Sequence, residues 1–235
     1  MEVQVKGANC SLSESLITRL LSLGTTVICD NHAYHLELNS VLLAHSEAKL
    51  LAEGNAFSIS FDGSAADIVI GTDLIIIDLI PSRPGGRWSA QRFISWAQGH
   101  TSVSDSVNWW LAEADAASVI ARICRANRLC DAIELCGRRS WKESDTYSEF
   151  SNLWQRTTMG QSGNFTPQAL THMPISGMGA IPVGSKTPSR PKLESIHSLL
   201  DDIDGEGFRP LTPLRTAMMK LIAGIINQSQ LGSLE

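Results

Sequence analysis

Residues 3–31 read VQVKGANCSLSESLITRLLSLGTTVICDN, and they contain the clearest secondary-structure pattern of the chain. It opens with a short run of alternating apolar residues and Gly7, and continues with apolar residues at helical spacing from Ser13 to Leu23. After Gly24 it closes with the β-branched run TTVIC. Strand, helix and strand follow one another, and the connection has the length that a parallel crossover needs. The sequence therefore predicts a βαβ unit.

Two further strands are predicted downstream of this unit. Residues 57–61 (FSISF) alternate like a strand, and residues 73–80 (DLIIIDLI) form a nearly continuous apolar run, which is typical of a central strand. Between them, residues 64–70 are expected to form a short helix that ends before a glycine. We therefore expect a parallel sheet over the first eighty or so residues, with strands near four apolar positions: Val3, Val27, Ile59 and Ile76.

Beyond residue 80 the pattern is mostly helical. Residues 159–190 are the exception, because they are rich in Gly, Pro, Ser, Thr and Met and have no periodic apolar surface. Helices are expected at 89–98, 113–128, 193–200 and 211–227, and a strand at 132–136.

This pattern predicts three parts along the chain. The first is an α/β domain over residues 1–158, built on the parallel sheet with flanking helices. A flexible loop or linker follows over residues 159–192, and a small α-rich C-terminal segment occupies residues 193–235.

Composition excludes several classes of protein. The 235 residues carry a net charge of −5 with a pI near 5.7, so no basic field is available for nucleic acid. The N-terminus lacks the pattern of a secretory signal, and no stretch reaches the roughly 18 apolar residues that span a bilayer. We expect no membrane partner and a cytoplasmic location. The five cysteines are odd in number and scattered, which indicates reduced core thiols.

A metal site is not expected. His32 and His35 lie close in sequence to Cys29 and Asp30, but Cys29 belongs to a predicted strand and no second group of ligands has zinc spacing. The two histidines are therefore predicted to be surface or loop residues.

The turn after the first strand and the acid after the second are the candidate ligand-binding residues. In a dinucleotide site the helix amides face the pyrophosphate, and a carboxylate at the end of the next strand accepts ribose hydroxyls. Only the first residue of this turn is a glycine, although three glycines are usual in such a turn. The candidates are Gly7, Asn9, Cys10, Ser11 and Leu12 in the turn, with Asp30 and Asn31 after the second strand.

The wider pattern resembles the extended short-chain dehydrogenase/reductase family, the NAD-dependent nucleotide-sugar epimerases and dehydratases. Residues 3–31 resemble its first βαβ unit, and residues 74–80 resemble its central fourth strand. Phe61 and Asp62 resemble the strand that ends in an Asp beside the adenine, which adds Asp62 to the candidates. Residues 108–120 and 132–145 resemble later segments of the family. The resemblance implies a Rossmann-like parallel sheet, NAD or NADP as cofactor, and a nucleotide or nucleotide-sugar as ligand.

This chain departs from the family at the catalytic residues. The family's Tyr-x-x-x-Lys lies between the two blocks, and neither Tyr34 nor Tyr147 has a lysine four residues on. Cys10 and Ser13 place side chains where the backbone should approach phosphate. The sequence therefore favours a shortened, degenerate relative whose NAD or NADP binding is weak or lost and which lacks the usual hydride transfer.

Two other functions stay open. An active nucleotide-sugar enzyme could use a different acid or base, for which Asp62, Asp78 and Asp115 are the candidates. Alternatively, the chain is an interaction or regulatory subunit, which forms a homo-oligomer or docks a partner protein through its Trp-rich middle and its apolar C-terminal helix.

Overall fold

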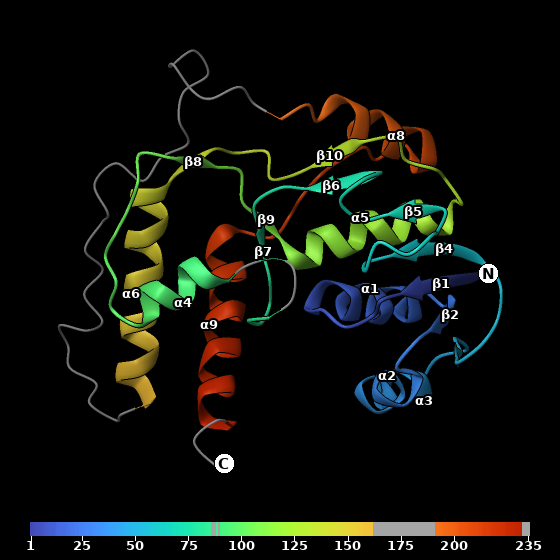
Figure 1. Ribbon diagram of the computed structural model, residues 1–235, viewed down its shortest axis with the longest axis horizontal. Coiled ribbons are helices and arrows are strands. Elements are labelled where there is room, and N and C mark those ends of the chain that lie inside the picture. Colours follow the sequence, from blue (N-terminus) through green and yellow to red (C-terminus); the bar gives the residue numbers. More distant parts are fainter. Residues whose placement is uncertain (86–87, 89, 162–190, 232–235) are drawn as a thin grey trace.

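The computed structural model describes residues 1–85, 88, 90–161 and 191–231. Short strands dominate the first half of the chain, and the longest helices lie in the second half (Figure 1). The strands are β1 (Glu2–Lys6), β2 (Thr26–Cys29), β3 (Leu50–Leu51), β4 (Phe57–Ser60), β5 (Ile68–Val69), β6 (Leu74–Ile76), β7 (Leu79–Ile80), β8 (Val107–Asn108), β9 (Leu111–Ala112), β10 (Ile133–Leu135) and β11 (Trp141–Lys142). The helices are α1 (Ser11–Ser22), α2 (His32–Leu38), α3 (Ser40–Ala44), α4 (Gln91–Ala97), α5 (Glu113–Arg125), α6 (Glu143–Gln161), α8 (Glu194–Asp204) and α9 (Leu214–Leu231).

Five parallel strands form the main sheet, in the order β3-β2-β1-β4-β5 (Figure 1). Val3 lies opposite Val27 on one side and Phe57 on the other. A single parallel bridge between Ile70 and Leu74 leads on to β6, which pairs in parallel with β10. The predicted α/β fold with a parallel sheet and flanking helices is confirmed.

Helices α1 and α5 pack side by side and supply the main core. Their buried residues form one cluster with the inward side chains of the sheet, among them Val3, Val5 and Ile59. Because α1 has apolar residues at helical spacing, Leu16, Ile17 and the residues one turn later are fully buried. The core therefore lies between the sheet and these two helices.

The opposite face is polar along two paired strands of the sheet, β1 and β4. Gln4 and Lys6 of β1 and Ser58 and Ser60 of β4 alternate with the buried apolar residues. Residues 61–67 join β4 to β5 without a helix, although a parallel connection usually needs a dozen residues or more. Lys6 Nζ donates to the Ala65 carbonyl at 2.6 Å, so this connection folds back over the polar face.

The helix predicted at residues 64–70 was wrong. These residues form bends and then strand β5. The Asp67 carboxylate accepts hydrogen bonds from the Ser58 amide at 2.7 Å and the Ser58 hydroxyl at 2.8 Å. Such side-chain bonds to backbone compete with helical hydrogen bonding.

The predicted central strand at residues 73–80 also needs correction. It is split into β6 and β7 at Asp78, whose φ of 51° lies in the left-handed region. The Asp78 carboxylate accepts the Trp109 amide at 2.6 Å, and β7 then pairs with β9. Strand β4, rather than this run, occupies the place beside β1.

The remaining predicted elements are present with shifted ends. The helices expected at 89–98, 113–128, 193–200 and 211–227 correspond to α4, α5, α8 and α9, and the strand expected at 132–136 corresponds to β10. Helix α6 extends to Gln161, and the rest of the loop predicted at 159–190 lies outside the described residues.

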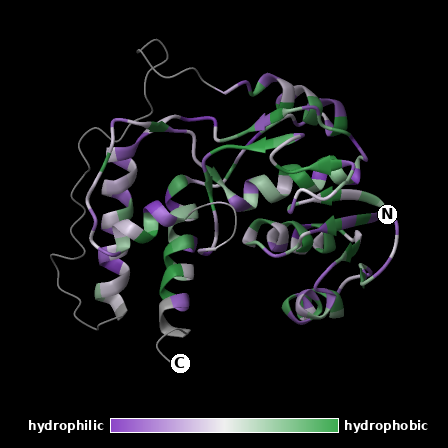
Figure 2. Ribbon diagram, in the orientation of Figure 1, coloured by the Kyte–Doolittle hydropathy of each residue, from purple (hydrophilic) through white to green (hydrophobic). Residues whose placement is uncertain are grey.

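A second hydrophobic cluster joins α4, α6 and α9. It is built on aromatic side chains, with the rings of Phe93 and Trp96 at 5.2 Å and those of Phe93 and Phe150 at 5.4 Å. Helix α9, which is largely hydrophobic in Figure 2, contributes Met218 and Leu221.

None of the helices within residues 1–161 and 191–231 combines the length and apolar character that crossing a bilayer requires.

Candidate functional site

The candidate residues meet at the carboxyl ends of β1, β2 and β4. Gly7, at the end of β1, has a φ of 65°, which only glycine adopts without strain. Its amide donates to Asp30 Oδ2 at 3.0 Å, and the Ala8 amide donates to Asp30 Oδ1 at 3.1 Å. The carboxylate after β2 therefore holds the turn after β1 in place.

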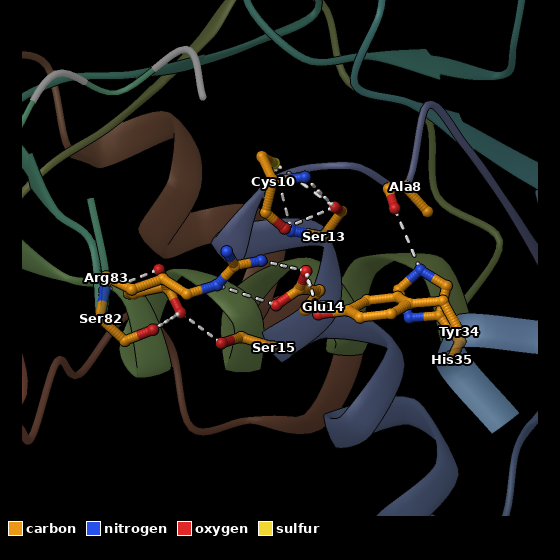
Figure 3. A network of polar contacts seen from close by, with 10 residues as sticks. Ala8, Cys10, Ser13, Glu14, Ser15, Tyr34, His35, Ser82 and Arg83 are labelled. Carbon is orange, nitrogen blue, oxygen red and sulfur yellow. Dashed lines mark hydrogen bonds and ion pairs between the residues drawn. The ribbon is translucent and has the colours of Figure 1, made fainter. Parts of the chain in front are cut away.

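Cys10 and Ser13 close the start of α1 with reciprocal hydrogen bonds. The Cys10 amide donates to Ser13 Oγ at 3.1 Å, and the Ser13 amide donates to Cys10 Sγ at 3.5 Å (Figure 3). Both side chains are buried. Within the described residues, the amides of Ser11 and Leu12 have no hydrogen-bond acceptor, so these two donors are left to a ligand.

Asp62 lies directly against Gly7. A Cβ atom added to Gly7 would lie 2.7 Å from Asp62 Cβ and 2.8 Å from Asp62 Cγ. Asp62 Oδ1 accepts the Ser64 amide at 2.9 Å and the Ser60 hydroxyl at 2.9 Å. Hydrogen bonds from Ser64, and then from Ser60, lower the pKa of Asp62 to about 2. Asp62 is therefore an ionised carboxylate at neutral pH.

The two asparagines predicted for the site lie at its rim. Asn9 is exposed, and its amide donates to the Gly7 carbonyl at 2.8 Å. Asn31 is exposed in a left-handed conformation with φ 53° and precedes α2 without a side-chain cap. The structure thus brings Gly7, Asp30 and Asp62 into direct contact and leaves these two side chains accessible.

The expectation that His35 is a surface or loop residue was wrong. His35 belongs to α2 and is fully buried, with Nε2 3.0 Å from the Ala8 carbonyl (Figure 3). Because a carbonyl only accepts, Nε2 carries the proton. Nδ1 is buried and has no partner among the described residues. His35 therefore helps to fix the turn after β1 through its hydrogen bond to the Ala8 carbonyl. Within the same part of the chain, no group of three or more His, Cys, Asp or Glu side chains could hold a metal.

Glu14 connects three segments beside the turn. The Arg83 guanidinium contacts its carboxylate through two nitrogens, and the Tyr34 hydroxyl donates to it at 3.0 Å (Figure 3). Burial, and then the hydrogen bond to Glu14, raise the pKa of the Tyr34 phenol. A hydride-transfer tyrosine needs its pKa lowered, so Tyr34 has the opposite environment.

A buried carboxylate that we did not single out from the sequence is Glu113, the first residue of α5. It accepts hydrogen bonds from the Ser15 hydroxyl, from the Ser82 amide at 2.9 Å and from the Ser82 hydroxyl at 2.8 Å. Glu113 is 3% exposed and lines a cavity of about 50 Å³ together with Thr212 and Lys220. In the sequence, Glu113 was recognisable only as an acidic residue at the start of a predicted helix, where the helix dipole favours a negative charge.

The other acids considered as catalytic residues support loops. Asp78 holds the Trp109 amide, and burial raises its pKa. Asp115 accepts the amides of Leu211 and Thr212 at 3.2 and 2.9 Å, and it also accepts the Thr212 hydroxyl. Neither contacts the turn after β1.

The strand order, the left-handed glycine and the acid after β2 define a Rossmann-like α/β protein. No protein-family model matches the sequence, and no curated protein matches it significantly. Solved structures do match its fold. One is a UDP-glucose-4-epimerase from Stenotrophomonas maltophila with bound NAD, with 10% identity, a TM-score of 0.59, and 98% of this chain and 99% of that chain covered.

Two further solved structures support the same fold. A UDP-glucuronic acid 4-epimerase variant from Bacillus cereus in complex with NAD has 10% identity and a TM-score of 0.55, with 97% of this chain and 100% of that chain covered. A dTDP-glucose 4,6-dehydratase from Bacillus anthracis in complex with NAD has 8% identity and a TM-score of 0.53, with both chains covered fully. The predicted resemblance to extended short-chain dehydrogenase/reductases is therefore confirmed for the fold.

Proposed function

We propose that this chain is a degenerate relative of the NAD-dependent epimerases and dehydratases, which binds a nucleotide or nucleotide-sugar at the carboxyl edge of its sheet and does not transfer hydride. The observation that carries the proposal is the contact of Asp30 with the amides of Gly7 and Ala8. This contact keeps the turn and the acid of a dinucleotide site together, while no tyrosine in the sequence has the lysine that catalysis needs.

Nucleotide binding is supported by the hydrogen-bonding groups that remain accessible at the carboxyl edge of the sheet. Asp30 is exposed, and a carboxylate has about four lone pairs, so it can accept ribose hydroxyls besides the two amides. The free amides of Ser11 and Leu12 lie at the positive end of the α1 dipole. The carboxylate also favours NAD over NADP, because a 2′-phosphate would be repelled by it.

A weak affinity for NAD is supported by the capping hydrogen bonds at the N-terminus of α1. The amides of Cys10 and Ser13 are engaged by each other's side chains, so fewer donors face a phosphate. We expect dissociation constants of roughly 10–100 μM for NAD. Cys10→Gly with Ser13→Gly should strengthen binding, because the double change frees both amides.

The absence of hydride transfer is supported by the environments of the tyrosines. Tyr34 pairs with Glu14, and Tyr147 packs its ring 5.3 Å from Trp96. The alternative of another acid or base has little support. The pKa of Asp62, lowered to about 2, makes its carboxylate a weak base and a poor proton donor, while Asp78 and Asp115 hold backbone amides.

A role as an interaction subunit is favoured by one specific observation. Four of the large hydrophobic side chains that are well exposed in the described structure lie within eight residues on α2 and α3: Tyr34, Leu36, Leu38 and Val41. The Trp-rich middle and the C-terminal helix, through which docking was predicted, instead bury Trp96, Met218 and Leu221 in the second hydrophobic cluster. We therefore propose the α2–α3 region as the contact surface, either in a homo-oligomer or with a partner protein.

Calorimetric titration of the purified protein with NAD, NADP and UDP-sugars tests the binding. Asp30→Asn should weaken binding about tenfold or more, because it removes the charge that accepts ribose hydroxyls. Glu37→Gln is the control, because it removes an equal charge from the exposed surface of α2. In parallel, absorbance at about 340 nm should show no nicotinamide reduction with any UDP-sugar. Reduction would overturn the proposal.

A further inference from the structure

The sheet has a topological switch point between β1 and β4. From β1, the strands β2 and β3 follow on one side, while β4 and β5 lie on the other (Figure 1). In open parallel sheets, ligands bind in the crevice outside the carboxyl ends of the strands at this point, and a dinucleotide crosses it with its pyrophosphate. In this chain the crevice is bounded by Gly7 after β1 and by the residues after β4.

The prediction that Asp62 lies beside an adenine is not met, because Asp62 follows β4, which pairs with β1 on the side opposite β2, and lies against Gly7 at this switch point. The Phe61 amide donates to the Lys6 carbonyl at 3.0 Å, which continues the pairing of β4 with β1 and brings Asp62 onto Gly7. The 2.7 and 2.8 Å separations of the Asp62 Cβ and Cγ from the Cβ position of Gly7 leave no room between them. The Asp62 side chain therefore lies against the turn that the pyrophosphate of a dinucleotide crosses in such sheets.

Two cations of the described chain close to this edge, Lys6 and Arg83, are engaged elsewhere. Lys6 donates to the Ala65 carbonyl, and Arg83 pairs with Glu14. On the other side of Gly7, the Asp30 carboxylate is a second negative group. Two carboxylates flanking one turn repel a pyrophosphate, whereas both can accept hydrogen bonds from hydroxyl groups.

We propose that the site takes a ribonucleoside over β1 and β2, with its hydroxyls on Asp30, and that Asp62 excludes a pyrophosphate at the switch point. This narrows the ligand class of the proposed function and rests on it. Asp62 is thereby a specificity-determining residue, and a nucleoside such as adenosine or uridine binds more tightly than NAD or a UDP-sugar.

Titration of the full chain with adenosine, uridine, ADP, UDP and NAD tests the proposal. We expect one nucleoside to bind about tenfold more tightly than its diphosphate and than NAD. Raising the salt from about 0.05 to 0.5 M should strengthen the binding of the diphosphate, because salt screens the repulsion, and should leave the nucleoside unchanged. At an ordinary phosphate site the affinity falls as salt is raised. An affinity for the diphosphate that rises with salt therefore indicates repulsion without the need for a variant.

Two matched variants locate the effect. Asp62→Asn should tighten diphosphate binding about tenfold and change nucleoside binding by less than about twofold. Asp67→Asn removes the same charge from the other end of the 61–67 connection, where Asp67 faces Ser58, and should change neither. Circular dichroism confirms that each variant is folded.

The outcomes separate the two proposals. Diphosphate or NAD binding that is tighter than nucleoside binding and falls with salt overturns the role of Asp62 and leaves the proposed function standing. If no nucleoside, nucleotide or dinucleotide binds at millimolar concentration, the proposed function fails and this inference fails with it.

Discussion

At the residue scale, the candidate site depends on one glycine between two carboxylates. Gly7 is left-handed, its amide is held by Asp30, and Asp62 packs against its α carbon. A side chain at this position would meet both a conformational cost and a steric one. This double constraint requires a glycine at position 7, whereas Cys10 and Ser13 occupy the positions of the other two glycines usual in such a turn.

Gly7→Ala should destabilise the protein by about 2–4 kcal/mol, because a left-handed alanine costs about 1–2 kcal/mol and the new methyl group collides with Asp62. Gly24→Ala is the control, since Gly24 has a φ of 73° and nothing within 4 Å of its Cβ position. It should cost about 1–2 kcal/mol. Urea unfolding measures both, and equal losses would show that the Asp62 contact has no energetic weight.

Acid should remove a stabilising contribution of Asp62. Its folded-state pKa of about 2 lies below the ordinary 3.8, so its contribution is fully present above about pH 4 and is lost as the pH falls through about 2. The stability difference between the wild type and Asp62→Asn should therefore shrink between pH 4 and 2. Thermal unfolding at several pH values measures this difference. A difference independent of pH would contradict the lowered pKa.

At the element scale, Glu113 joins three segments of the chain. It lies at the start of α5, and its carboxylate binds Ser15 of α1 and Ser82 after β7. Beside it, Glu14 of α1 binds Arg83. Adjacent residues of α1 therefore hold adjacent residues of one loop, one pair through a buried carboxylate and the other at the surface.

Glu113→Ala should destabilise the protein by about 2 kcal/mol, because it leaves three partly buried donors of Ser15 and Ser82 without their acceptor. Glu14→Ala serves as the control. It removes an ion pair whose arginine side chain is 46% exposed, so its cost should stay within about 1 kcal/mol. Chemical denaturation compares the two. If Glu14→Ala is the more costly change, the buried carboxylate does not hold these elements together.

At the scale of the whole molecule, the two faces of the sheet differ in which of the described segments cover them. Helices α1 and α5 cover the apolar face, while the connection 61–67 crosses the polar one. The elements therefore differ greatly in how much surface they bury. Helix α3 buries no residue, whereas α4 buries Phe93 and Trp96.

Hydrogen exchange should reveal this difference. The amides of α3 should exchange at least about 100-fold faster than those of β1 and α1, because little buried apolar area opposes local opening. Helix α4 controls for length, since it is also short but is anchored by two aromatic rings. Mass spectrometry of exchanged peptides gives the order. Slow exchange in α3 at dilutions where the chain is monomeric would contradict this account of the buried area, whereas protection that appears only at high concentration is expected from the proposed contact surface.

The sequence by itself determined the elements whose pattern is local. The β1-α1-β2 unit follows from residues 3–31, and α5 and α9 follow from their helical spacing, because each depends on side chains a few positions apart. It also indicated Gly7 and Asp30, since a glycine turn and an acid after the next strand are local signals.

Only the tertiary structure decided which distant segments meet. It placed β4 beside β1, divided residues 73–80 at Asp78, and brought Asp62 onto Gly7 and Glu113 onto Ser15. Strands in a parallel sheet pair through backbone groups that every residue carries, so the apolar run at 73–80 and the FSIS strand could each have taken the central place. The choice came from contacts across the sheet, where Ser58 and Ser60 suit the polar face and Ile59 suits the core.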